Sequence, residues 1–306
     1  MNTQILNGDC IEMMRTLKDQ SVNCCVTSPP YYGLRDYGHE GQIGLEETPE
    51  AFVQKMVEVF SEVKRVLRDD GTLWLNIGDT YSATRWSKGG GQGINAHSDE
   101  HRSMQHSKNS GLPDKNLIGI PWRVALALQA DGWYLRQDII WHKPNPMPES
   151  VQDRCTKAHE YIFLLSKSSK YYYDIESIKE PVSETSKERL NQNIESQIGS
   201  NRVPFKTNGN MKAVGNSDFR NKRSVWTVTT KPYSGAHFAT FPTDLIRPCI
   251  LAGCPKGGVV LDPFGGSGTT AAVANEENRN AILCELNPEY IPLINERLSK
   301  VQPSLF

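Results

Sequence analysis

Residues 259–270 read VVLDPFGGSGTT, and this stretch decides the fold class. The apolar run VVLD is typical of a buried strand, and a helix over residues 268–274 follows it after a glycine-rich turn. Glycines in such a turn let the backbone approach a ligand closely. The turn is not a P-loop, since no lysine follows its last glycine, and it lacks the GxGxxG pattern of nicotinamide dinucleotide sites.

A second strand is expected over residues 281–285, and it ends in Glu285, 17 residues after Gly268. A carboxylate at that position can hold both hydroxyls of a ribose. The order of strand, glycine turn, helix, strand and acid therefore predicts a site for a nucleoside cofactor.

Alternating strands and helices extend over the rest of the chain. The other expected strands are 3–6, 22–27, 72–77, 134–141 and 161–165, and the other expected helices are 10–17, 49–67, 121–130, 243–251 and 288–298. This alternation predicts an α/β protein with a doubly wound, mixed, seven-stranded sheet. The segment 134–165 has no helix between its two strands, so we expect an antiparallel hairpin at one edge.

The strand 22–27 ends abruptly in residues 28–31, SPPY. Two consecutive prolines fix φ and have no N–H to donate, so the exposed groups are acceptors: the Ser28 hydroxyl oxygen and the Pro29 carbonyl. Two fixed acceptors suit a substrate with two N–H donors, such as the amino group of a base, and Tyr31 offers a flat face on which a flipped base can stack. A structural turn that packs an aromatic ring is the alternative.

Both loops follow strands, and ligands of open α/β sheets bind at the carboxyl ends of strands. We therefore expect these two loops, about 230 residues apart in sequence, to face each other across one crevice.

The composition predicts a globular protein, with 38% hydrophobic and 23% charged residues and no stretch of roughly 20 apolar residues that could span a membrane. The N-terminus lacks a signal-peptide pattern, and the seven cysteines contain no CxxC pair. Buried, reduced thiols and a cytoplasmic location are therefore expected.

The formal net charge of −1 gives no global sign of a nucleic-acid partner. Locally, residues 187–231 carry nine Lys or Arg against three Asp or Glu, in a polar stretch without apolar periodicity. A solvated loop and a phosphate-contacting insert both fit this pattern.

Five segments resemble the amino-group DNA methyltransferases, which modify cytosine N4 or adenine N6. TSPPY (27–31) resembles their catalytic motif and DPFGGSGTT (262–270) their cofactor motif, in the order of the circularly permuted beta-type subgroup. NGD (7–9), IIWHKPNPMPES (139–150) and HFATFP (237–242) resemble the segments near the cofactor's adenine, the target base and the cofactor's methionine end.

The resemblance implies a permuted class I methyltransferase fold, S-adenosyl-L-methionine as cofactor, double-stranded DNA as substrate and a restriction endonuclease as companion. The implied catalytic residues are Ser28, Pro29, Pro30 and Tyr31. The implied cofactor-binding residues are Asp9, Thr240, Phe241, Pro242, Asp262, Phe264, Gly265, Gly266, Ser267, Gly268, Thr269 and Glu285. Cytosine N4 is favoured over adenine N6 as the target, because Ser28 is neutral where the adenine enzymes more often carry a carboxylate.

The resemblance also divides the chain. Residues 1–175 form the catalytic half with a mobile loop at 82–117, residues 176–231 form the target-recognition insert, and residues 232–306 form the cofactor half. The expected DNA-binding residues are Arg220, Lys222 and Arg223. The resemblance gives no role to the loop 82–117, and the sequence carries no signal for oligomeric state.

Rival functions remain open on the sequence alone. Cytosine C5 methylation needs a cysteine nucleophile, and Pro248-Cys249 lies inside an expected apolar helix, where a core thiol is the better interpretation. An RNA or protein amide methyltransferase, and a binding protein without catalysis, share much of the pattern.

Five further side chains are of types that bind metals or bases. His97, His101 and His106 lack nearby Cys or acid ligands, so no metal site is expected. Trp141 and His142 are candidates for walls of the target pocket, although Trp141 could equally belong to the core.

Overall fold

The computed structural model describes residues 1–34, 38–39, 41–82, 110–183, 187, 218–230 and 241–302. The chain forms two compact units, one of residues 1–174 with 224–306 and the other of residues 175–223.

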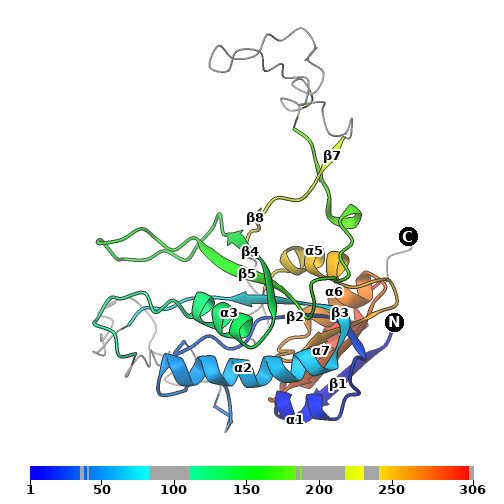
Figure 1. Ribbon diagram of the computed structural model, residues 1–306, viewed down its shortest axis with the longest axis horizontal. Coiled ribbons are helices and arrows are strands. Elements are labelled where there is room, and N and C mark those ends of the chain that lie inside the picture. Colours follow the sequence, from blue (N-terminus) through cyan, green and yellow to red (C-terminus); the bar gives the residue numbers. More distant parts are fainter. Residues whose placement is uncertain are drawn as a thin grey trace. The chain divides into compact units, whose positions relative to one another are not determined.

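The first unit is built on an eight-stranded sheet in the order β1-β10-β9-β2-β3-β5-β4-β8 (Figure 1). Its strands are β1 (Thr3–Asn7), β2 (Val22–Thr27), β3 (Leu67–Ile77), β4 (Tyr134–His142), β5 (His159–Ser166), β8 (Val225–Thr227), β9 (Val259–Asp262) and β10 (Asn280–Glu285). Neighbouring strands are parallel except that β5 is antiparallel to both β3 and β4. The doubly wound, mixed sheet predicted from the sequence is confirmed.

All seven expected strands are present, and the sheet has an eighth, β8, that the sequence did not indicate. β8 pairs with the end of β4, from Ile140 to His142, so the β4–β5 hairpin lies one strand in from the edge. The sequence gives no signal for β8 because VWT is three residues long and lies inside the polar, basic segment 187–231. The second unit ends at Arg223, so residues 224–230, which were assigned to the insert, belong to the first unit.

Helices cover both faces of the sheet. They are α1 (Cys10–Arg15), α2 (Pro49–Val66), α3 (Ile120–Ala130), α5 (Thr243–Gly253), α6 (Thr269–Glu276) and α7 (Tyr290–Ser299). In Figure 1, α2 and α3 lie on one side of the strands and α5 lies on the other. Gly253 of α5 approaches Cys24 and Trp74 so closely that a Cβ there would lie 2.8 Å from the thiol sulfur and 2.6 Å from the indole nitrogen.

Local chemistry sets the start of α2 as the sequence predicts, whereas β3 begins at Leu67, five residues earlier than the expected strand. The Thr48 hydroxyl oxygen accepts a hydrogen bond from the Ala51 N–H at 3.1 Å, and Pro49 occupies the first turn, where no N–H is needed. The apolar side of α2 is fully buried, and it includes Phe52, Met56 and Phe60.

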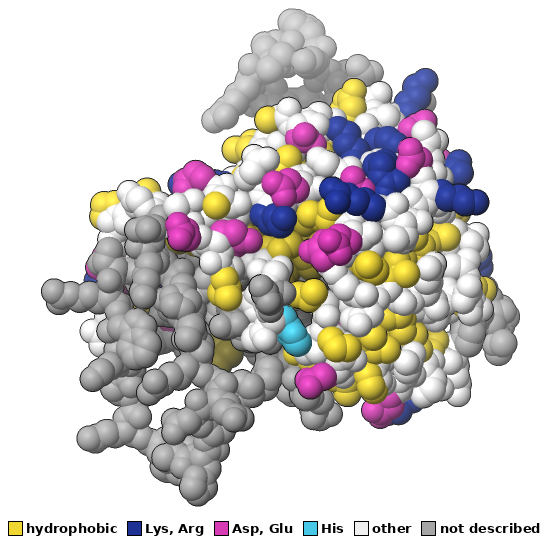
Figure 2. All heavy atoms as spheres, turned by 90° about the horizontal axis from the view of Figure 1, so that it is seen from below, with side chains coloured by type: hydrophobic (Ala, Val, Ile, Leu, Met, Phe, Trp, Pro, Cys, Tyr) yellow, Lys and Arg dark blue, Asp and Glu magenta, His cyan; other side chains and the backbone are white. Residues whose placement is uncertain are grey.

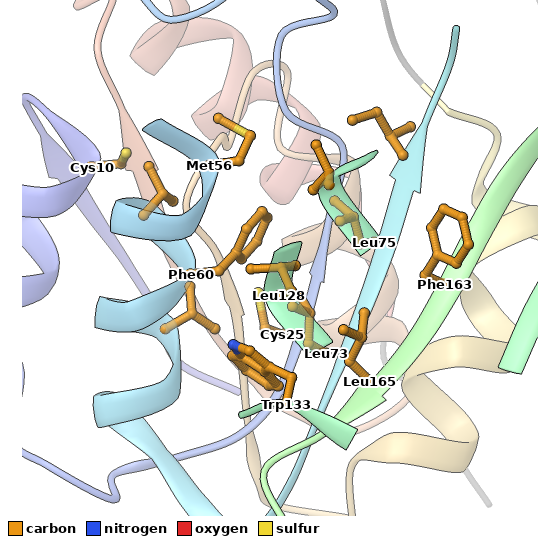
Figure 3. Close-up of a cluster of buried hydrophobic side chains, with 14 of the residues drawn as sticks. Cys10, Cys25, Met56, Phe60, Leu73, Leu75, Leu128, Trp133, Phe163 and Leu165 are labelled. Atoms are coloured by element: carbon orange, nitrogen blue, oxygen red, sulfur yellow. The ribbon is translucent and has the colours of Figure 1, made fainter. Parts of the chain in front are cut away.

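The main hydrophobic core lies between the sheet and α1, α2 and α3. Figure 3 shows Met56 and Phe60 of α2 facing Cys25, Leu73 and Leu75 of the central strands. At about 25 cal/mol per Å² of apolar area removed from water, such side chains supply the main force that holds α2 on the sheet. This packing fixes the strands whose carboxyl ends carry the functional loops.

The second unit contains η1 (Glu176–Ile178) and a two-stranded antiparallel ribbon of β6 (Glu180–Pro181) and β7 (Phe219–Arg220). The Val182 N–H donates to the Asp218 carbonyl at 2.8 Å and extends this ribbon. Glu180 accepts from both Arg220 at 3.0 Å and Arg223 at 2.6 Å.

Charged side chains of both signs are mixed on the surface. On the face seen in Figure 2, Lys and Arg side chains lie among Asp and Glu side chains. Ion pairs along α2 follow this pattern, such as Lys55 with Glu58 at 3.0 Å. Among the residues that the structure describes, no helix combines the length and the hydropathy that a membrane span requires.

Candidate active site

The two predicted loops lie side by side because their strands are neighbours. β2 pairs with β9 in parallel, through Cys24 with Val260 and Cys25 with Leu261. From β9 the chain winds outward to β10, and from β2 it winds the opposite way to β3, so a topological switch point lies between them. The Thr27 hydroxyl donates to Asp262 at 2.6 Å and ties the two strand ends together.

A cavity of about 900 Å³ opens at this switch point. Ligand pockets range over roughly 300–1,000 Å³, so this one can hold a nucleoside cofactor and a base together. The expected site residues that line it are Asp9, Ser28, Pro29, Pro30, Tyr31, Phe241, Asp262, Phe264, Gly265, Gly266, Ser267, Thr269 and Glu285. Pro242 and Gly268 are not among its lining residues, and Thr240 lies outside the described residues.

Glu285 ends β10 with a buried carboxylate that the protein only partly satisfies. Its two oxygens accept from the Gly266 N–H at 2.7 Å and from the Asn287 N–H at 2.8 Å. The Leu286 N–H also interacts with this carboxylate. A carboxylate offers about four lone-pair sites, so acceptor capacity remains for a hydroxyl donor of a ligand. Burial raises the pKa of Glu285. The residues present therefore fit the ribose of a nucleoside cofactor.

Asp262 lines the cavity, but its side chain binds the protein. Its oxygens accept from the hydroxyls of Thr27 and Thr270, each at 2.6 Å, and from the Phe264 N–H at 3.0 Å. Burial raises the pKa of this carboxyl to about 7. Asp262 thus joins β2, β9 and α6 at the floor of the site.

The glycine turn is shaped by protein packing as much as by any ligand. A Cβ on Gly268 would lie 2.9 Å from Ile294 of α7, and φ is +76° at this residue. A Cβ on Gly265 would lie 3.1 Å from Leu283 and 3.2 Å from the Cys284 carbonyl. A larger residue at Gly265 would push the turn away from β10, and one at Gly268 would collide with α7.

Asp9 caps α1 at the same end of the cavity. One of its carboxylate oxygens accepts from the Ile11 N–H at 2.9 Å and the Glu12 N–H at 3.0 Å. The structure gives the other oxygen no partner among the described residues. Asp9 therefore has an acceptor available next to the glycine turn.

The SPPY turn, where the sequence predicts two acceptors, lines the cavity. Within the described residues, no group donates a hydrogen bond to the Ser28 hydroxyl oxygen or the Pro29 carbonyl, although both residues line the cavity. An acceptor without a protein partner at a cavity wall is available to a substrate N–H.

Tyr31 is held firmly from two sides. Its ring lies so close to Gly78 that a Cβ there would come within 2.4 Å of the ring. Its hydroxyl donates to Glu160 at 2.6 Å and lies 3.4 Å from the side-chain oxygen of Asn76. The glycine that follows β3 therefore leaves the space that Tyr31 occupies.

Glu160 connects Tyr31 to Trp141, another aromatic side chain of the cavity. Its other oxygen forms an ion pair with Lys143, whose ammonium lies 4.2 Å from the centre of the Trp141 ring. The Trp141 N–H donates to the Val228 carbonyl at 2.8 Å, and only 4% of its side chain is exposed. Trp141 is thus both a wall of the cavity and part of the core, while His142 is not among the lining residues.

Lys157 and Asp79 complete this end of the cavity. The Lys157 ammonium donates to the Asp79 carbonyl at 3.0 Å, and burial lowers the pKa of Lys157. One Asp79 carboxylate oxygen accepts from the N–H groups of Thr80, Gly119 and Ile120, at 2.9, 3.0 and 3.0 Å, and so caps α3.

Charged and polar cavity residues outside the segments that the sequence singles out include Asn76, Asp79, Lys157 and Glu160. Asn76 and Asp79 could have been found, since they lie at the carboxyl end of β3, the neighbour of β2. Lys157 and Glu160 carry no such signal, because only the antiparallel return of β5 brings them to this edge.

The remaining candidates lie elsewhere. Arg220, Lys222 and Arg223 belong to the second unit. Cys249 is buried in α5, as a core thiol should be. Six of the seven cysteines are buried, and Cys155 is exposed, which departs from the expectation. No group of three or more His, Cys, Asp or Glu in the described residues could hold a metal ion, and the histidines of residues 97–106 fall outside them.

The family model for DNA methylases of the N6/N4 type matches residues 22–296. The chain belongs to this family. Membership confirms the predicted class of enzyme, a DNA methyltransferase that uses S-adenosyl-L-methionine.

Curated relatives agree with this assignment, and solved structures share the fold. The type II methyltransferase M.Cfr9I of Citrobacter freundii is 48% identical, over 96% of this chain and 87% of its own. M.SmaI of Serratia marcescens is 47% identical, over 96% of this chain and 90% of its own. The cytosine-N4-specific PvuII DNA methyltransferase shares the fold with a TM-score of 0.63 and 19% identity, over 99% of this chain and 89% of its own. A putative DNA modification methylase of Thermus thermophilus, complexed with S-adenosyl-L-methionine, gives a TM-score of 0.59 and 23% identity. The match covers 100% of this chain and 98% of its own.

Proposed function

We propose that this DNA methyltransferase transfers a methyl group to the exocyclic N4 amino group of cytosine in double-stranded DNA. The observation that carries the proposal is the neutral acceptor pair of Ser28 and Pro29, which lines the cavity with no competing donor among the described residues. The solved structure with the same fold and a TM-score of 0.63 is named as specific for cytosine N4.

The cofactor lies, in this proposal, along the glycine turn that follows β9. Glu285 accepts the ribose hydroxyls with the lone pairs that Gly266 and Asn287 leave free. Asp9 and Phe241 line the same cavity and border the nucleoside and the methionine end. When bound, S-adenosyl-L-methionine supplies a methyl group already activated by its sulfonium.

The chain itself mainly positions the base. Ser28 and Pro29 accept the two N–H groups of the amino group and direct its nitrogen toward the glycine turn, while Tyr31 stacks on the ring. Because the tyrosine hydroxyl is held by Glu160 and its ring by Gly78, the stacking face is fixed before the base arrives. No nucleophilic side chain and no covalent intermediate are needed.

The second unit supplies DNA contacts in this proposal, through Arg220, Lys222 and Arg223 on and after β7. The curated relatives carry type II names, and by that likeness a restriction endonuclease with the same recognition sequence is the expected companion. In this proposal the enzyme acts in the cytoplasm.

The test is to express the chain in cells, digest their DNA to nucleosides and analyse these by mass spectrometry. N4-methylcytosine is expected, and N6-methyladenine in its place would contradict the choice of base while leaving the family and the site intact. Ser28→Ala should lower the methylation rate roughly 100-fold, because an acceptor made for the reacting amino group is lost. Cofactor affinity, measured by calorimetry, should stay nearly unchanged in that variant.

A further inference from the structure

The loop that joins β4 to β5, residues 143–158, carries an exposed methionine at the edge of the cavity. Met147 is 85% exposed, the highest value among the large hydrophobic side chains described, and it also lines the cavity. A residue with both properties stands at the rim, between the pocket and the solvent. Single exposed apolar side chains are common, so the argument depends on how this one is held.

The segment that carries Met147 is stiff. Every second residue from 144 to 148 is a proline, and each proline ring fixes the φ angle of its residue. Asn145 is clamped to Thr230: its side-chain N–H donates to the Thr230 carbonyl at 3.1 Å, and its side-chain oxygen accepts from the Thr230 N–H at 3.0 Å.

The returning part of the loop is equally well anchored. Arg154 binds both oxygens of Glu149, at 2.6 and 3.4 Å, and its guanidinium lies 4.2 Å from the centre of the Tyr81 ring. The Lys157 N–H donates to the same carboxylate at 3.2 Å. The loop therefore holds Met147 in place without burying it, which leaves its apolar side chain exposed to solvent in the free protein.

An apolar tip of this kind suits the inside of a base stack. A base that leaves the duplex for the pocket opens a gap between its neighbours, and DNA-binding proteins insert Met, Leu, Ile or Phe side chains between base steps. Methionine is flexible and polarizable, so it can lie against base faces of different shape. Because Met147 borders the pocket, the gap and the pocket mouth would be adjacent.

We infer that Met147 is a wedge that enters the DNA duplex and occupies the position that the target base leaves. The inference rests on the proposed function only in requiring that a base of duplex DNA enters this cavity, and it holds for cytosine and for adenine alike.

The experiment compares two DNA duplexes that contain the sequence methylated by the wild-type enzyme, as identified by sequencing of modified DNA. In one duplex the target base is paired, and in the other an abasic site stands opposite it, so that little pairing energy resists flipping. Met147→Ala should lower kcat/KM about 10-fold or more on the paired duplex and less than about 3-fold on the abasic one. Met147→Leu should retain most of the activity.

Val151→Ala is the matched control, since Val151 lies in the same loop, is 40% exposed and is not among the lining residues of the cavity. Its kcat/KM should match that of the wild type on both duplexes. Equal activity of Met147→Ala and wild type on the paired duplex would overturn the wedge, and so would an equal loss on both duplexes. Absence of any methylated base with the wild-type enzyme would instead overturn the proposed function.

Discussion

Glu285 combines burial with an incomplete set of hydrogen bonds, and a ligand is the natural source of the missing donors. Glu285→Ala should weaken binding of S-adenosyl-L-methionine by about 2–3 kcal/mol, the loss expected for a pair of charge-assisted hydrogen bonds. Glu285→Gln should lose less, because one acceptor remains. Glu296→Ala is the control, since Glu296 is exposed on α7 and pairs only with Lys300 in the structure. Calorimetry that finds equal affinity in Glu285→Ala and wild type would remove Glu285 from this role.

Glu160 and Lys143 are a largely buried ion pair in which each charge depends on the other, with side chains 14% and 18% exposed. Glu160→Gln should lower the free energy of unfolding by about 1–3 kcal/mol, because Lys143 then keeps its charge without a partner. Glu160→Gln with Lys143→Met should recover part of that loss. Urea unfolding measures the free energy of unfolding of both variants. The exposed pair of Glu58 with Lys55 is the reference, and Glu58→Gln should lower the free energy of unfolding by less than about 0.5 kcal/mol. A double variant less stable than Glu160→Gln would contradict this account.

At the scale of elements, the junction of β2, β9 and α6 depends on Asp262, and its pKa of about 7 makes that junction sensitive to pH. The pKa in the folded protein lies above the unfolded value of about 3.9, so folding favours the neutral carboxyl. The contribution of Asp262 to the free energy of unfolding is therefore fully present below about pH 4, and it is lost as the pH rises to about 7.

The comparison variant is Asp262→Asn, which cannot ionise. Its amide can donate to the Thr270 hydroxyl, which in turn lies 3.4 Å from the Val26 carbonyl as an alternative acceptor. Between pH 4.5 and pH 7.5, the free energy of unfolding of the wild type should fall relative to that of Asp262→Asn. Urea titrations at four pH values measure this difference, and a difference that stays constant over the range would show that Asp262 does not titrate in it.

The elements near the site differ in how well the sequence predicts them. The strands β2 and β9 were found because apolar runs end in residues that cannot continue a strand, and the rule that ligands bind at carboxyl ends brought their loops together. The strand β8 was missed because three residues give no period. Glu160 was missed because its role arises from the antiparallel pairing of β5 with β4, which places it opposite Trp141. Contacts set by long-range pairing leave no local signal in the sequence.

At the scale of the whole molecule, a net charge of −1 does not show how basic side chains are distributed between the two compact units. The described residues that line the cavity all belong to the first unit, whereas the expected DNA-binding side chains belong to the second. Reversing the charges of Arg220, Lys222 and Arg223 together should therefore abolish DNA binding and leave cofactor affinity unchanged. Fluorescence anisotropy with labelled duplex DNA and calorimetry with the cofactor test the two halves of this prediction. Unchanged DNA affinity in the triple variant would contradict it.

Glu180 adds a sharper test, because it binds two of these three basic residues, Arg220 at 3.0 Å and Arg223 at 2.6 Å. If the arginines contact phosphates, the carboxylate competes with DNA for them. Glu180→Gln should then tighten DNA binding and make it fall more steeply with salt, since each additional phosphate contact changes the slope of log K against log salt by about −0.9.

The matched control for that measurement is Glu176→Gln, which removes a carboxylate from the same unit, one that pairs with Lys179 and with neither arginine in the contacts described. It changes the net charge by the same amount, so a general effect of charge would appear equally in both variants. A larger gain for Glu180→Gln is expected. Weaker binding in Glu180→Gln would mean instead that the carboxylate orients the arginines for DNA, and an unchanged salt slope would mean that they do not reach the phosphates.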